Sequence, residues 1–184
     1  MFLRRLSFAW LCFFACVAVT AAVSDRVRAA STPGFAAEQI KAAFLLHLFH
    51  FVVWVDDKRE TQELCFLDAG EVSVAVTALL EKRPANIRIR QLDGLDEVSS
   101  CHMLFVSSDR ADAGSALLVS AMSASVLVVS DQQGFAEQGG MLELERQPAR
   151  IGLIVNLPVL EAAGLTPSSK LLRLAKILGS TAGF

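Results

Sequence analysis

Two runs in the middle of the sequence are apolar at nearly every position and restrict the fold most strongly. MLFVS falls in a predicted strand at 102–107, and SVLVVS forms a predicted strand at 125–130. A segment at 111–122 with the composition of a helix separates them. A strand that is apolar on both faces must be covered on both, as in parallel sheets whose connecting helices pack on either side. The pattern predicts parallel strands joined by right-handed helical crossovers.

The segments before these runs also alternate between predicted helices and predicted strands. The segment from Phe35 to about Val53, FAAEQIKAAFLLHLFHFVV, is apolar almost all round and charged only in its first turns, which predicts a buried helix that Trp54 ends. Three further elements follow it: a strand at 64–67, a helix at 72–81 and a strand at 86–92. No repeat, low-complexity segment or linker interrupts the chain, so we expect one domain at 35–181.

After Asp131 the pattern changes to a β-hairpin. The segment 141–145 alternates apolar and acidic residues, so Glu143 and Glu145 are expected on a solvent-facing side of a strand. A short polar connection leads to RIGLIVN at 150–156, which completes the hairpin.

Two helices are expected at the end of the chain. The first, at 157–163, should stop at Gly164, a residue suited to the position after a helix. The second should begin at Pro167 or Ser168 and align its apolar residues on one face, namely Leu171, Leu174, Ala175 and Leu178. The predicted fold is a single three-layer α/β domain with a mixed, mostly parallel sheet flanked by helices and with a C-terminal β-hairpin and helix.

The N-terminus has the layout of a secretory signal. Two arginines precede an apolar core that is shorter than the roughly 20 residues of a membrane span, and small residues follow it. Residues 1–29 are therefore predicted to be removed, with cleavage after Ala22 or after Ala29. Lipid attachment at Cys16 is a weaker alternative, because Phe13 replaces the aliphatic residue expected three positions earlier.

Export changes the charge of the chain. The full sequence has 17 basic and 19 acidic residues, of which the segment 1–29 contains four arginines and Asp25, so the mature chain has a net charge of −5. An acidic chain without a basic run lacks the electrostatic surface that binds nucleic acid. We expect a soluble protein in an exported compartment, a bacterial periplasm.

The cysteine in ELCFLDAG, Cys65, has several conceivable uses: a nucleophile, a metal ligand, a redox switch or half of a disulfide. Removal of the signal leaves only Cys65 and Cys101. In an oxidising compartment two such thiols most readily form one disulfide.

Motifs for catalysis or metal binding are weak. His47 and His50 are three residues apart on the predicted helix, but two histidines do not complete a zinc site, and His102 lies on another element. Cys101 and His102 are adjacent on a strand and should point to opposite faces, which argues against a Cys–His dyad. GFAEQGG matches no phosphate-binding glycine motif. The sequence offers no positive reason to expect an enzyme, a metal site or a cofactor.

Four blocks, in order, resemble the YfiR-like periplasmic proteins. They are IKAAFLLHLFHFVVW, LCFLDAG, CHMLFVSS, and the long segment from GFAEQGG to LLRLAKI. The family positions matched are Trp54, Gly140, Asn156, Gly164, Leu171 and Leu172. Val55 stands where the family has a proline after the tryptophan, and glycine follows the LCFL block only after Asp68 and Ala69.

This resemblance implies a non-enzymatic periplasmic regulator. The best-known member binds the periplasmic sensor domain of an inner-membrane diguanylate cyclase and represses it, which limits cyclic di-GMP and biofilm formation. Cys65 and Cys101 match the pair that forms the family's shared disulfide. A second pair near the hairpin, present in that member, is missing here, so the resemblance supports a structural bridge and leaves redox sensing open.

A second hypothesis is a sensor of small ligands. Open α/β sheets bind ligands at the carboxyl ends of their strands. Here these ends are followed by loops that contain Ser108, Asp109 and Asp131. The partner expected under the first hypothesis is the periplasmic domain of an inner-membrane protein, and the sequence also allows for a homodimer.

Overall fold

The computed structural model describes residues 33–54, 59–108, 115–148 and 150–179. The chain divides into two compact units, Met1–Ala36 and Ala37–Phe184. The sheet, the core and the cavities described below belong to the second unit. The predicted signal peptide, its cleavage sites and Cys16 lie outside the described residues.

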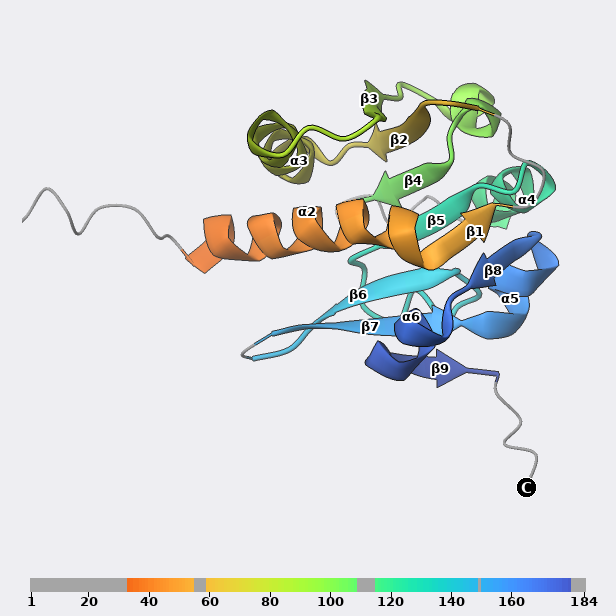
Figure 1. Cartoon of the computed structure of the whole chain (residues 1–184). Helices are drawn as coiled ribbons and strands as arrows, with labels where there is room; N and C mark the ends of the chain where they lie inside the picture. Colours follow the sequence, from red (N-terminus) through yellow and green to blue (C-terminus); the bar gives the residue numbers. More distant parts are fainter. Residues whose placement is uncertain (1–32, 55–58, 109–114, 149, 180–184) are drawn as a thin grey trace, which may run out of the picture. The chain divides into compact units, whose positions relative to one another are not determined.

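In the described part of the chain, seven strands form one sheet, which Figure 1 shows with β3 at the top and β9 at the bottom. Their order is β3-β2-β4-β5-β6-β7-β9. The first five are parallel to one another, β7 runs antiparallel to β6, and β9 runs parallel to β7. Their bounds are β2 Gln62–Leu67, β3 Ile87–Gln91, β4 Met103–Val106, β5 Leu127–Ser130, β6 Leu142–Arg146, β7 Ile151–Asn156 and β9 Ala175–Leu178.

The predicted parallel α/β arrangement is confirmed. Strands β4 and β5 are buried at every position, as their continuous apolar sequences require. The helices α3 (Gly70–Lys82) and α4 (Ser115–Ser123) and the short 3₁₀ helix η1 (Leu95–Ser100) connect the parallel strands. Phe66 and Phe105 meet edge to face in the core between β2 and β4, with ring centroids 6.1 Å apart.

The chain changes direction across the sheet between β2 and β4. From β2 it passes through α3 to β3 on one side, and then it returns past β2 to β4 and continues through α4 to β5 on the other side. This reversal leaves a gap between the loops that follow β2 and β4. Such switch points are where open α/β sheets bind ligands.

The predicted opening helix is present as α2 (Pro33–Phe51). The expectation that the helix continues to residue 53 is wrong, because Val52–Trp54 forms a short strand, β1, which pairs antiparallel with β8 (Leu165–Pro167). Lys41 contacts the residue after β5, and Trp54 contacts the residue before β4. Helix α2 therefore crosses the sheet from the carboxyl ends of the strands to their amino ends (Figure 1).

The β-hairpin is confirmed, but the placement of Glu143 on a solvent-facing side is wrong. Strand β6 pairs with β7 on one side and with β5 on the other. Glu143 is only 1% exposed, and its two carboxylate oxygens accept the backbone N–H groups of Gly134 and Ala136, each at 3.1 Å. The alternation of apolar and acidic residues does not show whether water or a neighbouring turn donates hydrogen bonds to a carboxylate.

The end of the chain differs from the prediction in the length of its second helix. Helix α5 (Leu157–Ala162) is followed by Gly164 with a φ of 74°, as expected for a residue after a helix. The Ser168 side chain accepts the N–H of Leu171 and so begins α6 as predicted, but α6 (Ser169–Leu174) stops after six residues. The next four residues form β9, because the free edge of β7 offers their backbone hydrogen bonds.

No helix in the described residues is long and apolar enough to cross a membrane.

Candidate functional site

A cavity of about 620 Å³ lies at the carboxyl ends of the parallel strands. Its walls come from the start of α2, the turn between β2 and α3, the residues after β4 and β5, and the end of β6. The volume falls within the range of roughly 300–1,000 Å³ that is usual for small-molecule sites. Charged and hydroxyl-bearing residues line most of it, so it suits a polar ligand better than an apolar one.

Three buried charges form one wall of this cavity. The Lys41 ammonium contacts Glu38 Oε1 at 2.9 Å and Asp131 Oδ2 at 2.5 Å, and each of these three side chains is 12% exposed or less. The other oxygen of Asp131 accepts the backbone N–H of Ser108 at 2.7 Å. This Lys41–Glu38–Asp131 cluster holds α2 to the loops after β4 and β5, and it carries one excess negative charge.

The cluster also sets the charge state of Lys41. Burial lowers the pKa of Lys41, whereas the hydrogen bonds and charges of Asp131 and Glu38 raise it. The second effect prevails, so that the pKa lies above its ordinary value of 10.5. Lys41 is therefore a fixed cation in the wall of the cavity.

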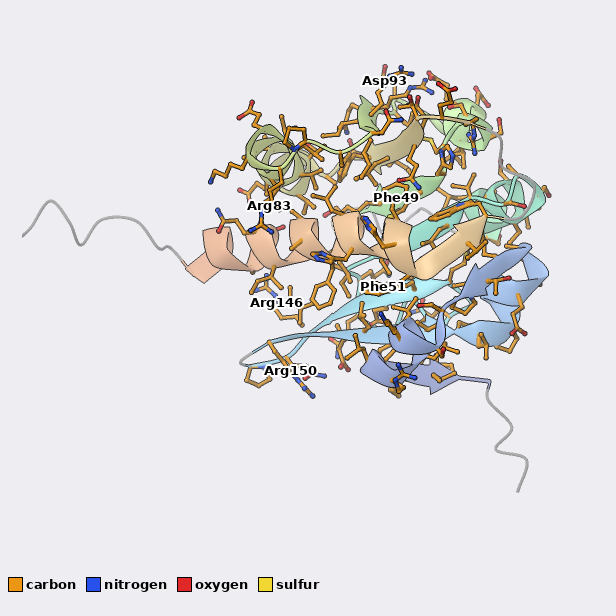
Figure 2. The ribbon with its side chains drawn as sticks, in the orientation of Figure 1. Phe49, Phe51, Arg83, Asp93, Arg146 and Arg150 are labelled. Carbon is orange, nitrogen blue, oxygen red and sulfur yellow. A yellow bond between two sulfur atoms is a disulfide. The ribbon has the colours of Figure 1, made fainter. Side chains whose placement is uncertain are left out.

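Another part of the cavity lining is the first turn of α3. Residue Asp68 adopts a φ of 52° as the chain leaves β2, and Ala69 precedes the helix without a side-chain hydrogen bond to it. The first intrahelical bond is donated by Ser73 to Ala69, so the backbone N–H groups of 70–72 have no partner within the helix. Residues 70–72 also belong to the lining of the cavity. Arg146 stands at the end of β6, below α2 in Figure 2, and adds a cation to the rim.

The structure brings together two of the three residues that the sequence placed in the ligand loops. Ser108 and Asp131 both line the cavity and are hydrogen-bonded to each other, whereas Asp109 lies outside the described residues. The sequence reasoning missed Glu38 and Lys41. Their signal was present, because they are charged residues in an otherwise apolar helix, but only the fold shows that they face Asp131.

The disulfide between Cys65 and Cys101 is present. It links the middle of β2 to the residue after η1, across 36 positions of sequence, and both cysteines are fully buried. A bridge without exposed sulfur atoms is suited to holding strands together. Its burial argues against easy access by a thiol reductant.

Next to the disulfide, Trp54 and His102 connect β1 to the sheet. Trp54 donates its indole N–H to the carbonyl of His102 at 3.0 Å, and the two rings meet edge to face. The Nδ1 atom of His102 accepts the backbone N–H of Glu63 at 2.9 Å, and His102 is fully buried. His102 therefore belongs to the packing of the sheet, and His47 and His50 are exposed on α2.

The other positions of the resemblance have structural roles. Gly140 lies against the ring of Phe135, which leaves no space for a side chain. Asn156 caps α5 by accepting the N–H of Val159, and it donates to the carbonyl of Ala136 at 2.9 Å. Leu171 is buried and Leu172 packs against the core from a half-buried position.

Among the described residues, no group of three or more histidine, cysteine, aspartate or glutamate side chains could hold a metal ion.

Comparison with solved structures shows limited similarity. A conserved domain protein from Vibrio cholerae O1 biovar El Tor matches with 13% identity and a TM-score of 0.49, over 76% of this chain and 59% of that chain. The ABC domain from Streptococcus pneumoniae, solved in complex with L-Trp, matches with 13% identity and a TM-score of 0.45, over 63% of this chain and 54% of that chain. The chain thus spans less than two thirds of either structure.

No curated protein sequence matches the chain. A family model described as YfiR/HmsC-like matches residues 38–176, which include the cavity, the disulfide, the hairpin and α6. The chain therefore belongs to the YfiR/HmsC-like family, which is known in periplasmic regulation.

Proposed function

We propose that this protein is a non-enzymatic periplasmic repressor that binds the periplasmic domain of an inner-membrane signalling protein, a diguanylate cyclase. The observation that carries this proposal is the family match over residues 38–176, which covers almost all of the described fold. The buried disulfide agrees with an exported protein, because such bridges persist in oxidising compartments.

Repression of this kind needs no chemistry in the regulator. A protein that binds the inactive conformation of its target better than the active one shifts the equilibrium toward the inactive form. A difference in binding free energy of about 1.4 kcal/mol changes the ratio of the two forms about tenfold.

The proposal is tested by deleting the gene in its source bacterium and measuring cyclic di-GMP by mass spectrometry, with surface attachment as a second readout. Cyclic di-GMP is expected to rise in the deletion strain. The full-length gene should restore the original level, whereas a copy without residues 1–29 should not. An unchanged level of cyclic di-GMP in the deletion strain would overturn the proposal.

The target is then identified genetically. Each diguanylate cyclase that has a periplasmic domain is deleted in the strain that lacks the regulator. Loss of the proper target should abolish the effect of the regulator, while loss of other cyclases should leave it.

A second candidate function, a periplasmic sensor of a small polar ligand, is favoured by the cavity at the strand ends. Ion pairs and a hydrogen bond within the protein fix the Lys41–Glu38–Asp131 cluster, so little ordering would accompany binding. Ligand binding in this cavity would contact α2, α3 and three loops together. A sensor function therefore gives the repressor a means of release.

This second function is tested by native mass spectrometry of protein purified gently from the periplasm. A bound small molecule that is lost in the Arg146→Ala variant and kept in the Arg83→Ala variant would support it. Both arginines are exposed, but only Arg146 lines the cavity. Wild-type protein that carries no small molecule after this gentle purification would contradict ligand sensing as the main role.

A further inference from the structure

A second cavity, of about 390 Å³, lies between the middle of α2, the hairpin β6–β7 and the junction of α6 with β9. Phe44, Ile151 and Leu153 give it an apolar floor. Leu174 stands at its side and is 69% exposed, the highest value among the large hydrophobic side chains of the described residues. We call this cavity with Leu174 the β9 groove.

The rim of the β9 groove has one excess positive charge, because Arg150 and Lys176 outnumber the carboxylate of Glu145, although the whole chain has a net charge of −2. Arg150, at the tip of the hairpin in Figure 2, and Lys176 of β9 both line it. Lys176 forms a contact of 3.2 Å with Glu137, but both side chains are more than half exposed, so this pair contributes little and is readily exchanged for another acidic partner. The groove therefore favours an acidic ligand.

Among the strands of the described residues, β9 forms one edge of the sheet, at the bottom of Figure 1. At the opposite edge, β3 carries two arginines, Arg88 and Arg90, which are paired with Glu63 and Glu97 and discourage strand addition. Strand β9 (AKIL) has a single charged residue, Lys176, and no proline. Its outer backbone groups can pair with a further strand.

We propose that the β9 groove and the β9 edge bind an extended segment of a partner protein, which adds a strand to the sheet. The segment carries an apolar side chain that packs against Leu174 and, two residues along on the same face, an acidic side chain that pairs with Lys176 or Arg150. The inference rests on the proposed function in one respect: the segment belongs to the periplasmic domain of the repressed protein.

The test uses a synthetic probe and no cyclase. The probe is a fluorescent octapeptide that repeats the sequence valine, threonine, glutamate, threonine. Valine and glutamate therefore lie on one face of the extended peptide, and threonine lies on the other. A control peptide has lysine in place of glutamate. Binding is measured by fluorescence polarisation, and hydrogen exchange of the amides of Ala175–Leu178 locates the site.

Two variants and one matched control make the test specific. Leu174→Asp and Lys176→Glu change exposed positions in the groove, and Val119→Asp changes a residue of α4 that is 63% exposed. The glutamate peptide should bind the wild type and Val119→Asp with equal affinity. Its affinity for each groove variant should be lower by about tenfold or more. Circular dichroism confirms that all three variants are folded.

Several outcomes would overturn the inference. They are equal binding of the two peptides, equal binding of the glutamate peptide to Leu174→Asp and to the wild type, absence of binding, or unchanged exchange of the β9 amides. A dimer in light scattering that Leu174→Asp dissociates would place a second copy in the groove and would also overturn it. Because the assay contains no cyclase, its failure is separate from an unchanged cyclic di-GMP level in the deletion strain.

Discussion

Replacement of Lys41 by methionine tests whether the buried cluster stabilises the fold. Methionine is similar in length to lysine but cannot neutralise Glu38 and Asp131. In the folded protein these two carboxylates, 12% and 10% exposed, would face each other without the cation between them. We therefore expect Lys41→Met to destabilise the protein.

The magnitude follows from the geometry of the cluster. Removing one partner of a buried ion pair usually costs about 3–5 kcal/mol. Lys41 contacts two carboxylates at 2.9 and 2.5 Å, but the cavity beside them admits water. The lower end, about 3 kcal/mol, is therefore expected. For a chain of 184 residues this corresponds to a decrease of roughly 6–12 °C in Tm.

Urea unfolding at neutral pH, followed by circular dichroism, measures the effect. Lys82→Met is the matched control, because Lys82 is exposed at the end of α3, and its change should stay within about 0.5 kcal/mol. A triple variant with Glu38→Gln and Asp131→Asn added to Lys41→Met removes all three charges, and we expect it to recover much of the lost stability.

The pH dependence gives an independent check. Since the pKa of Lys41 is raised in the folded state, its contribution to stability is complete below the ordinary value of 10.5 and is lost as the pH rises through the folded value. The difference between the wild type and Lys41→Met should stay constant from neutral pH to about pH 10 and narrow above it. A loss below about 1 kcal/mol, or a triple variant less stable than Lys41→Met, would refute the reasoning.

Four further predictions concern the hairpin and the disulfide. Glu143→Gln should lower the free energy of unfolding by about 2 kcal/mol, because an amide can accept only one of the two backbone N–H groups that the carboxylate accepts; an unchanged urea midpoint would contradict this. Gly140→Ala should cost about 1–3 kcal/mol, since its Cβ would lie 2.3 Å from a ring carbon of Phe135, and a Tm equal to that of the wild type would show that the ring moves freely. The double variant Cys65→Ala/Cys101→Ala should lose about 4 kcal/mol in the chain-entropy model for a separation of 36 residues. In the wild type, thiol trapping with mass spectrometry should find the bridge intact in mild reductant until urea unfolds the protein, and rapid reduction of the folded protein would contradict its burial.

The candidate site was predictable in part. Ser108 and Asp131 follow apolar strands, and the rule that loops after parallel strands meet at one edge was enough to place them near each other. Lys41 lies 90 positions before Asp131 in the sequence. Its helix is apolar on almost every side, so the sequence does not show which way the Lys41 side chain points. Only the tertiary structure, in which α2 crosses the sheet, places Lys41 beside Asp131 at the end of β5.

The sequence by itself determined the central architecture of this protein. Runs that are apolar on both faces, such as β4 and β5, can be stable only inside a sheet covered by helices, so local composition was sufficient. With residues 1–29 predicted to be removed, Cys65 and Cys101 were likewise the two thiols left to pair. Tertiary structure alone decided the features that depend on a distant partner. The segment 175–178 has helical spacing but forms β9, because β7 supplies backbone hydrogen bonds, and Glu143 is buried because the turn at 134–136 supplies its donors. Backbone and charged groups take whichever partner the fold places beside them, and the order of residues along the chain does not contain that information locally.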